Sequence, residues 1–137
     1  MFGTKNRQHV LASKNRPDLF RYIAGILKNK NCHLYQIGGV ADHIHIVTHI
    51  HPTVSLSSLV KDIKMASSHE IKQHQWFLNF SGWQEGYGAF TYSIKEKENL
   101  INYVKNQEEH HKIKTFKEEY EDLLIDHGIE YEEKYML

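Results

Sequence analysis

Apolar residues in the first half of the chain follow helical and then strand-like spacing. Between Pro17 and Asn29 they recur every three or four positions, which predicts an amphipathic helix. Two apolar runs follow, "CHLYQIGGV" at 32–40 and "DHIHIVTHI" at 42–50, with glycines between them. This pattern predicts a hairpin of two antiparallel strands.

The second half alternates helix signals with one further strand signal. The serine-rich "TVSLSS" begins a second amphipathic helix that carries Leu56, Leu59, Ile63 and Ala66. "AFTYSI" at 89–94 predicts a third strand, and apolar spacing from 95 to about 112 predicts another helix. A capping box, Thr115 with Glu118, begins a last helix over about 115–127 that stops at Gly128.

This order of elements predicts one α+β domain over residues 1–137. A ferredoxin-like antiparallel sheet, with helices on one face, has the order βαββαβ and begins with a strand before the first helix. Only Met1 and Phe2 precede the polar "GTKNRQ". We therefore expect a ferredoxin-like sheet whose first strand is very short or truncated, with an extra C-terminal helix.

Composition narrows the class of protein. The chain has 137 residues, of which 40% are hydrophobic, enough for a single core. The single cysteine, Cys32, excludes an intramolecular disulfide framework. No apolar run is long enough for a membrane span, and no signal-peptide pattern opens the sequence. These features predict a cytoplasmic protein.

The net charge of zero conceals a segregation of charge. Residues 1–75 hold ten Lys and Arg against four Asp and Glu, whereas residues 76–137 hold seven against thirteen. A basic half can follow a phosphate backbone. The alternative is that both halves form solvated faces.

The second predicted strand of the hairpin carries two histidines on the same face. His43 and His45 point to one side because a strand alternates with period two, so their ring nitrogens can converge on an ion. A partly exposed strand face is the alternative. His49 and His51 continue that face, but four successive same-face residues spread over roughly 20 Å at about 3.3 Å per residue, so at most two can share an ion.

A tyrosine and an amide lie four residues apart in the helix predicted after residue 95. Tyr103 and Gln107 would project from one helix face. A tyrosine can attack phosphorus, and an amide oxygen can ligate a metal. The alternative is a core-edge tyrosine and a surface glutamine. His110 and His111 could contact phosphate, but a favourable interaction of histidines with the helix dipole at the end of a helix is the preferred interpretation.

An aromatic-rich segment, "WFLNFSGWQEGYGAF" at 76–90, precedes the predicted third strand. Aromatic side chains can stack unpaired bases, as single-strand binders require. The alternative is a core wedge.

Together these segments resemble one family closely. The segments are "TKNRQ" at 4–8, "IGGVADHIHIV" at 37–47, "LSSLVKDIK" at 56–64, "WQEGYGAF" at 83–90, "YVKNQEEHH" at 103–111 and the C-terminal "TFKEEYEDLLIDHGIEYEEKYML". The chain resembles the single-tyrosine HUH (His-hydrophobic-His) transposases of the bacterial insertion sequence 200/605 group over nearly its whole length.

The resemblance implies an activity and the residues that carry it. It implies nicking and rejoining of single-stranded DNA at insertion-sequence ends through a 5′-phosphotyrosine, with Tyr103 as nucleophile. It also implies Mg²⁺ or Mn²⁺ held by His43, His45 and Gln107, and no nucleotide triphosphate. A homodimer would compose each site from the HUH strand, 42–50, of one subunit and the tyrosine helix, about 95–112, of the other.

The family also recognises DNA hairpins, and one departure from its pattern bears on activity. By position, Lys5, Arg7, Lys61 and Lys64 are the phosphate contacts that we expect. Family members carry a full first strand before the segment that matches "GTKNRQ". An N-terminally truncated, catalytically defective copy that still binds hairpin DNA is therefore the alternative function.

Overall fold

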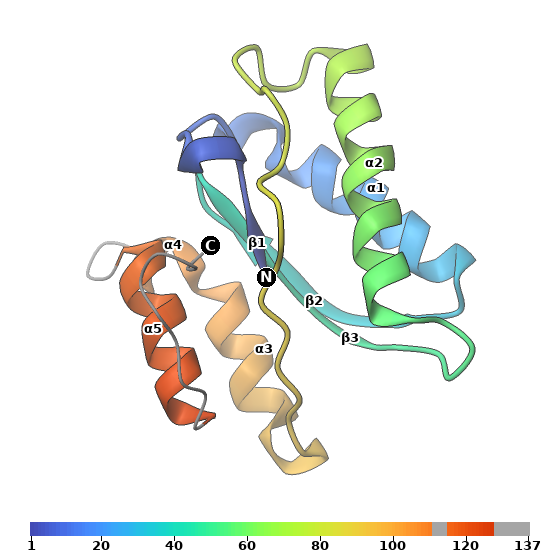
Figure 1. Cartoon of the computed structure of the whole chain (residues 1–137), viewed down its shortest axis with the longest axis vertical. Coiled ribbons are helices and arrows are strands. Elements are labelled where there is room, and N and C mark those ends of the chain that lie inside the picture. Colours follow the sequence, from blue (N-terminus) through green and yellow to red (C-terminus); the bar gives the residue numbers. More distant parts are fainter. Residues whose placement is uncertain (111–114, 128–137) are drawn as a thin grey trace.

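A computed structural model describes residues 1–110 and 115–127, without the side chain of His110. Its centre is an antiparallel sheet of three strands in the order β1-β3-β2 (Figure 1). The strands are β1 (Phe2–Gly3), β2 (His33–Gly39) and β3 (His43–His49). β3 pairs with β2 along its length, which confirms the predicted hairpin, and with β1 through Phe2 opposite Ile44. The fold is α+β with a very short first strand, as expected.

Two helices cover one face of this sheet and enclose the main core. They are α1 (Arg16–Asn29) and α2 (Leu56–His74), both predicted from apolar spacing. The core joins their buried residues to β3 through Ile44, which is fully buried. Ser55 caps α2 by accepting a hydrogen bond from the Ser58 amide.

The opposite face carries the C-terminal helices, so the helices lie on both faces of the sheet and not on one face as expected. Figure 1 shows α3 (Lys97–Lys105) and α5 (Phe116–Asp126) on this side of the sheet. Gly38 lets α3 approach closely, because a Cβ atom there would lie only 2.4 Å from the Val104 carbonyl oxygen. Backbone therefore meets backbone where α3 packs on β2.

The segment after α2 departs from the sequence prediction. Residues 89–94, expected as a third strand, form none. The preceding residues lie beside β1 through isolated contacts: the Gln84 amide donates to the Gly3 carbonyl at 3.0 Å, and the Gly88 amide donates to the Met1 carbonyl at 2.8 Å. Beyond that point the segment faces β3 across a cleft of about 580 Å³. A strand needs a hydrogen-bonded neighbour, and β1 provides one for two residues only.

The helix predicted over about 95–112 is divided. A 3₁₀ turn (Ile94–Glu96) leads into α3, and Asn106 separates α3 from α4 (Gln107–His110). His111 and Lys112 lie outside the described residues, as does Gly128, the predicted end of the last helix. The predicted capping box of α5 is confirmed, because Thr115 Oγ1 accepts a hydrogen bond from the Glu118 amide at 3.2 Å.

Two further 3₁₀ turns, Lys5–Arg7 and Ser13–Asn15, connect β1 to α1. Among the described residues, no helix is both long and apolar enough to cross a membrane.

Candidate metal and nucleophile site

The alternation of β3 turns His43 and His45 away from the main core, toward α3 and α5. Both imidazoles are buried, with 0% and 7% of their surface exposed, and their ring centroids lie 5.2 Å apart. Phe116, the first residue of α5, packs against the His43 ring at 4.4 Å. The two histidines predicted as ligands therefore lie together in a protected place.

Asp42 fixes the orientation of His43. Its Oδ1 lies 2.7 Å from His43 Nδ1. Because a carboxylate accepts, Nδ1 carries the proton and Nε2 keeps its lone pair for the site. A carboxylate behind a histidine is the usual partner of a metal-binding imidazole.

A carboxylate that the sequence reasoning missed completes the cluster. Glu119 of α5 is only 2% exposed, and its Oε1 lies 2.5 Å from His45 Nε2 and 4.0 Å from His43 Nε2. One ligand atom of each of these three residues lies within 4.8 Å of the others. The signal in the sequence was a charged residue between Phe116 and Leu124, at a position that helical spacing assigns to the buried face.

Burial keeps His45 neutral. Desolvation lowers the pKa of this imidazole from 6.5 to about 4, although the Glu119 carboxylate acts in the opposite direction. Neutral imidazole is the form that binds metal ions.

Tyr103 of α3 reaches the same cluster. Its ring centroid lies 5.9 Å from that of His45. Burial raises the pKa of the Tyr103 phenol, and the negative charge and hydrogen bond of Glu119 raise it further, while the Gln107 side chain acts against them. The phenol is therefore protonated at neutral pH, and it contacts both Glu119 and Gln107.

Gln107 is 1% exposed and lies at the start of α4. Its Nε2 donates to the Tyr103 carbonyl oxygen at 3.4 Å. Its Oε1 is buried and has no hydrogen-bond partner among the described residues. Such an oxygen suits a metal ligand, because a buried acceptor without a partner is costly. Within one chain, the structure thus places Tyr103 in contact with His45 and Gln107 in contact with Tyr103, so the four residues predicted for the metal and the nucleophile are connected through Tyr103.

The predicted phosphate contacts lie in different environments. Lys5 and Lys61 are exposed. The Arg7 guanidinium lies over the Phe116 ring, 5.1 Å from its centroid. Lys64, also expected as a phosphate contact, is half-buried, and its Nζ donates to the carbonyl oxygens of Gln84 and Gly86 at 2.9 and 2.6 Å.

The remaining sequence candidates lie apart from the cluster. His49 is exposed, and His51 Nδ1 pairs with Thr53 Oγ1 at 2.7 Å. Within residues 1–110 and 115–127, His43, His45 and Glu119 form the one group of three His, Cys, Asp or Glu side chains close enough together to hold a metal ion. His111 lies outside those residues, and the side chain of His110 is not described.

Part of the aromatic segment packs inward. Phe77 and Phe80 belong to the main core, and Trp83 packs edge-on against Phe2 at 5.0 Å. These residues form the core wedge that was the alternative to base stacking.

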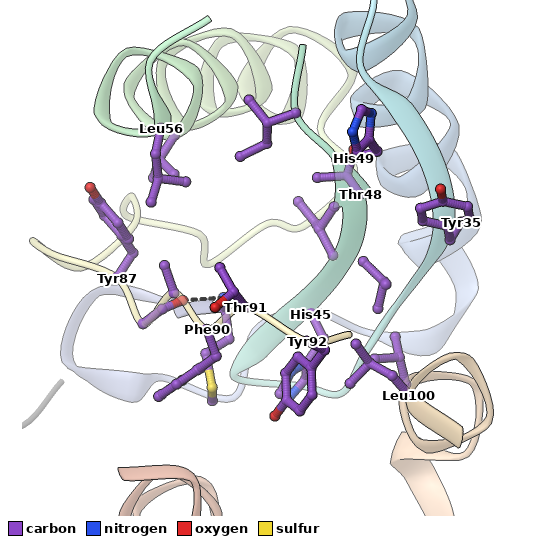
Figure 2. A pocket seen from close by; sticks show the side chains of 18 of the residues that line it. Tyr35, His45, Thr48, His49, Leu56, Tyr87, Phe90, Thr91, Tyr92 and Leu100 are labelled. Atoms are coloured by element: carbon purple, nitrogen blue, oxygen red, sulfur yellow. Dashed lines mark hydrogen bonds between the residues drawn. The ribbon is translucent and has the colours of Figure 1, made fainter. Parts of the chain in front are cut away.

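A cleft of about 580 Å³ opens from the site along β3. His45 and Tyr103 line its inner end. Figure 2 shows Tyr87, Phe90 and Tyr92 on one wall, with His45 and Thr48 of β3 on another. Through this cleft, a ligand from solvent can reach the side chains of His45 and Tyr103.

Comparison with known proteins identifies the family. The family model described as "Transposase IS200 like" matches residues 1–107, and the chain belongs to this family. The fold is similar to the crystal structure of a "putative transposase" from Deinococcus radiodurans R1, with a TM-score of 0.60 and 22% identity over 77% of this chain and 85% of that one. No curated protein matches the chain.

Proposed function

We propose that this transposase cleaves and rejoins single-stranded DNA at the ends of its element through Tyr103. The observation that carries the proposal is the position of Tyr103, which lies on a helix that packs against the buried histidine pair and lines the cleft together with His45. In the cleavage step the Tyr103 oxygen loses its proton and bonds to phosphorus. The bond from phosphorus to the 3′ oxygen breaks, and that oxygen takes up a proton. The products are a 5′-phosphotyrosine and a free 3′-OH.

Rejoining reverses these bond changes with a different 3′-OH. The phosphotyrosine preserves the energy of the phosphodiester, so the cycle consumes no nucleotide triphosphate. The chain contains no GxxxxGK[ST] sequence for binding one.

We propose that His43, His45 and Gln107 hold Mg²⁺ or Mn²⁺. Two features support this assignment: the neutral, buried imidazole of His45 and the buried Gln107 oxygen that has no hydrogen-bond partner in the described part of the chain. A bound divalent cation would stabilise the negative charge that develops on the scissile phosphate. Asp42 holds the His43 ring with Nε2 toward the site.

DNA binding would extend from this site over basic residues. We retain Lys5, Arg7 and Lys61 as proposed phosphate contacts, because the two lysines are exposed and Arg7 lies over Phe116, the residue that packs on the His43 ring. Lys64 would first have to release two carbonyl oxygens. Recognition of DNA hairpins is proposed from the family resemblance.

The experiment that tests the nucleophile is an adduct assay. The protein is incubated with single-stranded ends of its element and Mn²⁺, and covalent complexes are resolved on a denaturing gel. We expect Tyr103→Phe to reduce the adduct by at least about a thousandfold, since the attacking oxygen is gone. Tyr92→Phe, in the same cleft, should retain it. An adduct formed by Tyr103→Phe at the wild-type level would refute the assignment.

A mixing experiment tests the proposed homodimer with shared sites. His43→Ala and Tyr103→Phe chains are unfolded together, refolded and assayed. If one subunit supplies the histidines and the other the tyrosine, one intact site forms and the adduct appears on the His43→Ala chain. If each chain uses its own tyrosine, as the packing of Tyr103 on His45 would allow, the mixture stays inactive.

A further inference from the structure

We propose that Glu119 is an additional protein ligand of the divalent cation, so that helix α5 is part of the metal site. This inference rests on the proposed metal binding by His43 and His45. It assigns a role to a residue on a helix that lies outside the part of the chain matched by the family model, which ends at residue 107.

The geometry carries the proposal. A carboxylate oxygen of Glu119 and one nitrogen from each imidazole lie within 4.8 Å of one another, and all three side chains are buried. Glu119 Oε1 lies 2.5 Å from His45 Nε2 and 4.0 Å from His43 Nε2. In His43 the Nε2 atom keeps its lone pair, because the proton is on Nδ1, which donates a hydrogen bond to Asp42. A cation near these atoms would therefore meet two nitrogen donors and one oxygen donor.

The fold positions Glu119 from the start of α5. Thr115 caps this helix, and Phe116 packs on the His43 ring. The cap fixes where the helix begins, and the Phe116 contact holds its first turn against β3. Glu119 lies three residues beyond Phe116, on the same helix face, and its side chain consequently reaches the histidines.

The chemistry of the donors favours a hard divalent cation. A buried carboxylate is costly unless an opposing charge stabilises it, and a divalent cation supplies that charge. Carboxylate and amide oxygens are the ligands that Mg²⁺ and Mn²⁺ prefer, whereas two imidazoles alone suit Zn²⁺ equally well. With Gln107, the site would offer four protein ligands and leave room in a six-ligand shell for water and a phosphate oxygen.

The test measures Mn²⁺ affinity of the whole, metal-free chain by isothermal titration calorimetry, without DNA. We expect Glu119→Gln, which keeps the shape but loses the charge, to weaken binding at least about tenfold. Glu118→Gln is the matched control, because Glu118 is the residue before Glu119 and its side chain is exposed. This variant should bind Mn²⁺ as the wild type does. Circular dichroism confirms that each variant is folded.

Two further variants separate the possible failures. If Glu119→Gln binds Mn²⁺ within about twofold of wild type while His43→Ala does not bind, Glu119 is not a ligand and the histidine site stands. If His43→Ala also binds normally, the proposed metal site itself fails. If Glu119→Gln does not fold, Glu119→Asp decides: the shortened carboxylate should weaken Mn²⁺ binding, and unchanged affinity would overturn the proposal.

Discussion

Two pairs of histidines with the same spacing lie near the two ends of β3, and their surroundings differ completely. His43 and His45 are buried beneath α3 and α5, whereas His49 is exposed and His51 contacts Thr53 beyond the strand. Residue type and spacing are therefore insufficient for a metal site. The difference lies in the helices that cover the first pair and bring Tyr103, Gln107 and Glu119 to it.

The largest difference between the two pairs should appear in DNA adduct formation when a single histidine is replaced by alanine. We expect His43→Ala to reduce Mn²⁺-dependent DNA adduct formation by more than about a hundredfold, because a ligand is lost. His49→Ala and His51→Ala should remain within about twofold of wild type in the same gel assay. Equal losses from all three variants would instead indicate a histidine-cluster metal site that spans the strand.

The buried pair should also make stability depend on pH. The pKa of His45 is 6.5 when unfolded and about 4 when folded, so between these values the unfolded chain binds more protons. The unfolding free energy of the metal-free protein should therefore fall as pH decreases from 6.5 to 4, by up to roughly 3 kcal/mol from this group. Urea titrations at several pH values between 6.5 and 4 measure this unfolding free energy.

Substitutions isolate the His45 contribution from that of other groups. His45→Asn should flatten the pH dependence between pH 6.5 and 4, whereas His49→Asn should leave the slope of the wild type. The Met1 ammonium, whose pKa burial lowers to about 5, adds a slope of the same sign in all these chains. An unchanged slope in His45→Asn would show that His45 is not the titrating group.

A smaller effect should come from the residues that orient each pair. Asp42→Asn removes the carboxylate that fixes His43, and we expect Mn²⁺ affinity to fall about tenfold in calorimetry. Thr53→Ala removes the corresponding partner of His51 and should change the affinity by less than twofold. If both variants bind equally, Asp42 does not position the ligand.

Local patterns in the sequence predicted much of this fold. The hairpin of β2 and β3, the helices α1 and α2 and the capped start of α5 were predictable, because apolar spacing and caps act over a few residues. The same is true of His43 and His45 as same-face residues and of Tyr103 and Gln107 as residues one helical turn apart. The family resemblance then linked these two groups, which lie some sixty residues apart.

The remaining features depend on contacts between distant parts of the chain. Residues 89–94 have strand-like composition, but a strand also requires a neighbour, and the sequence does not reveal that a cleft lies between them and β3. Glu119 was missed because its role depends on how α5 packs across the sheet. Its charge on an otherwise apolar helix face was the only sign.

The contact between Gly38 and Val104 limits how far Tyr103, the proposed nucleophile, can be displaced. No side chain of β2 lies between the Gly38 backbone and the Val104 carbonyl oxygen, so a rotamer change at that position cannot alter the spacing of sheet and helix there. Tyr103 is the adjacent residue, and the position of its backbone on the sheet is therefore held by a contact between two backbones. The proposed reaction breaks one phosphodiester bond and makes another at the same phosphorus atom, so the Tyr103 oxygen would have to return to one position, and this contact would help to provide that reproducibility.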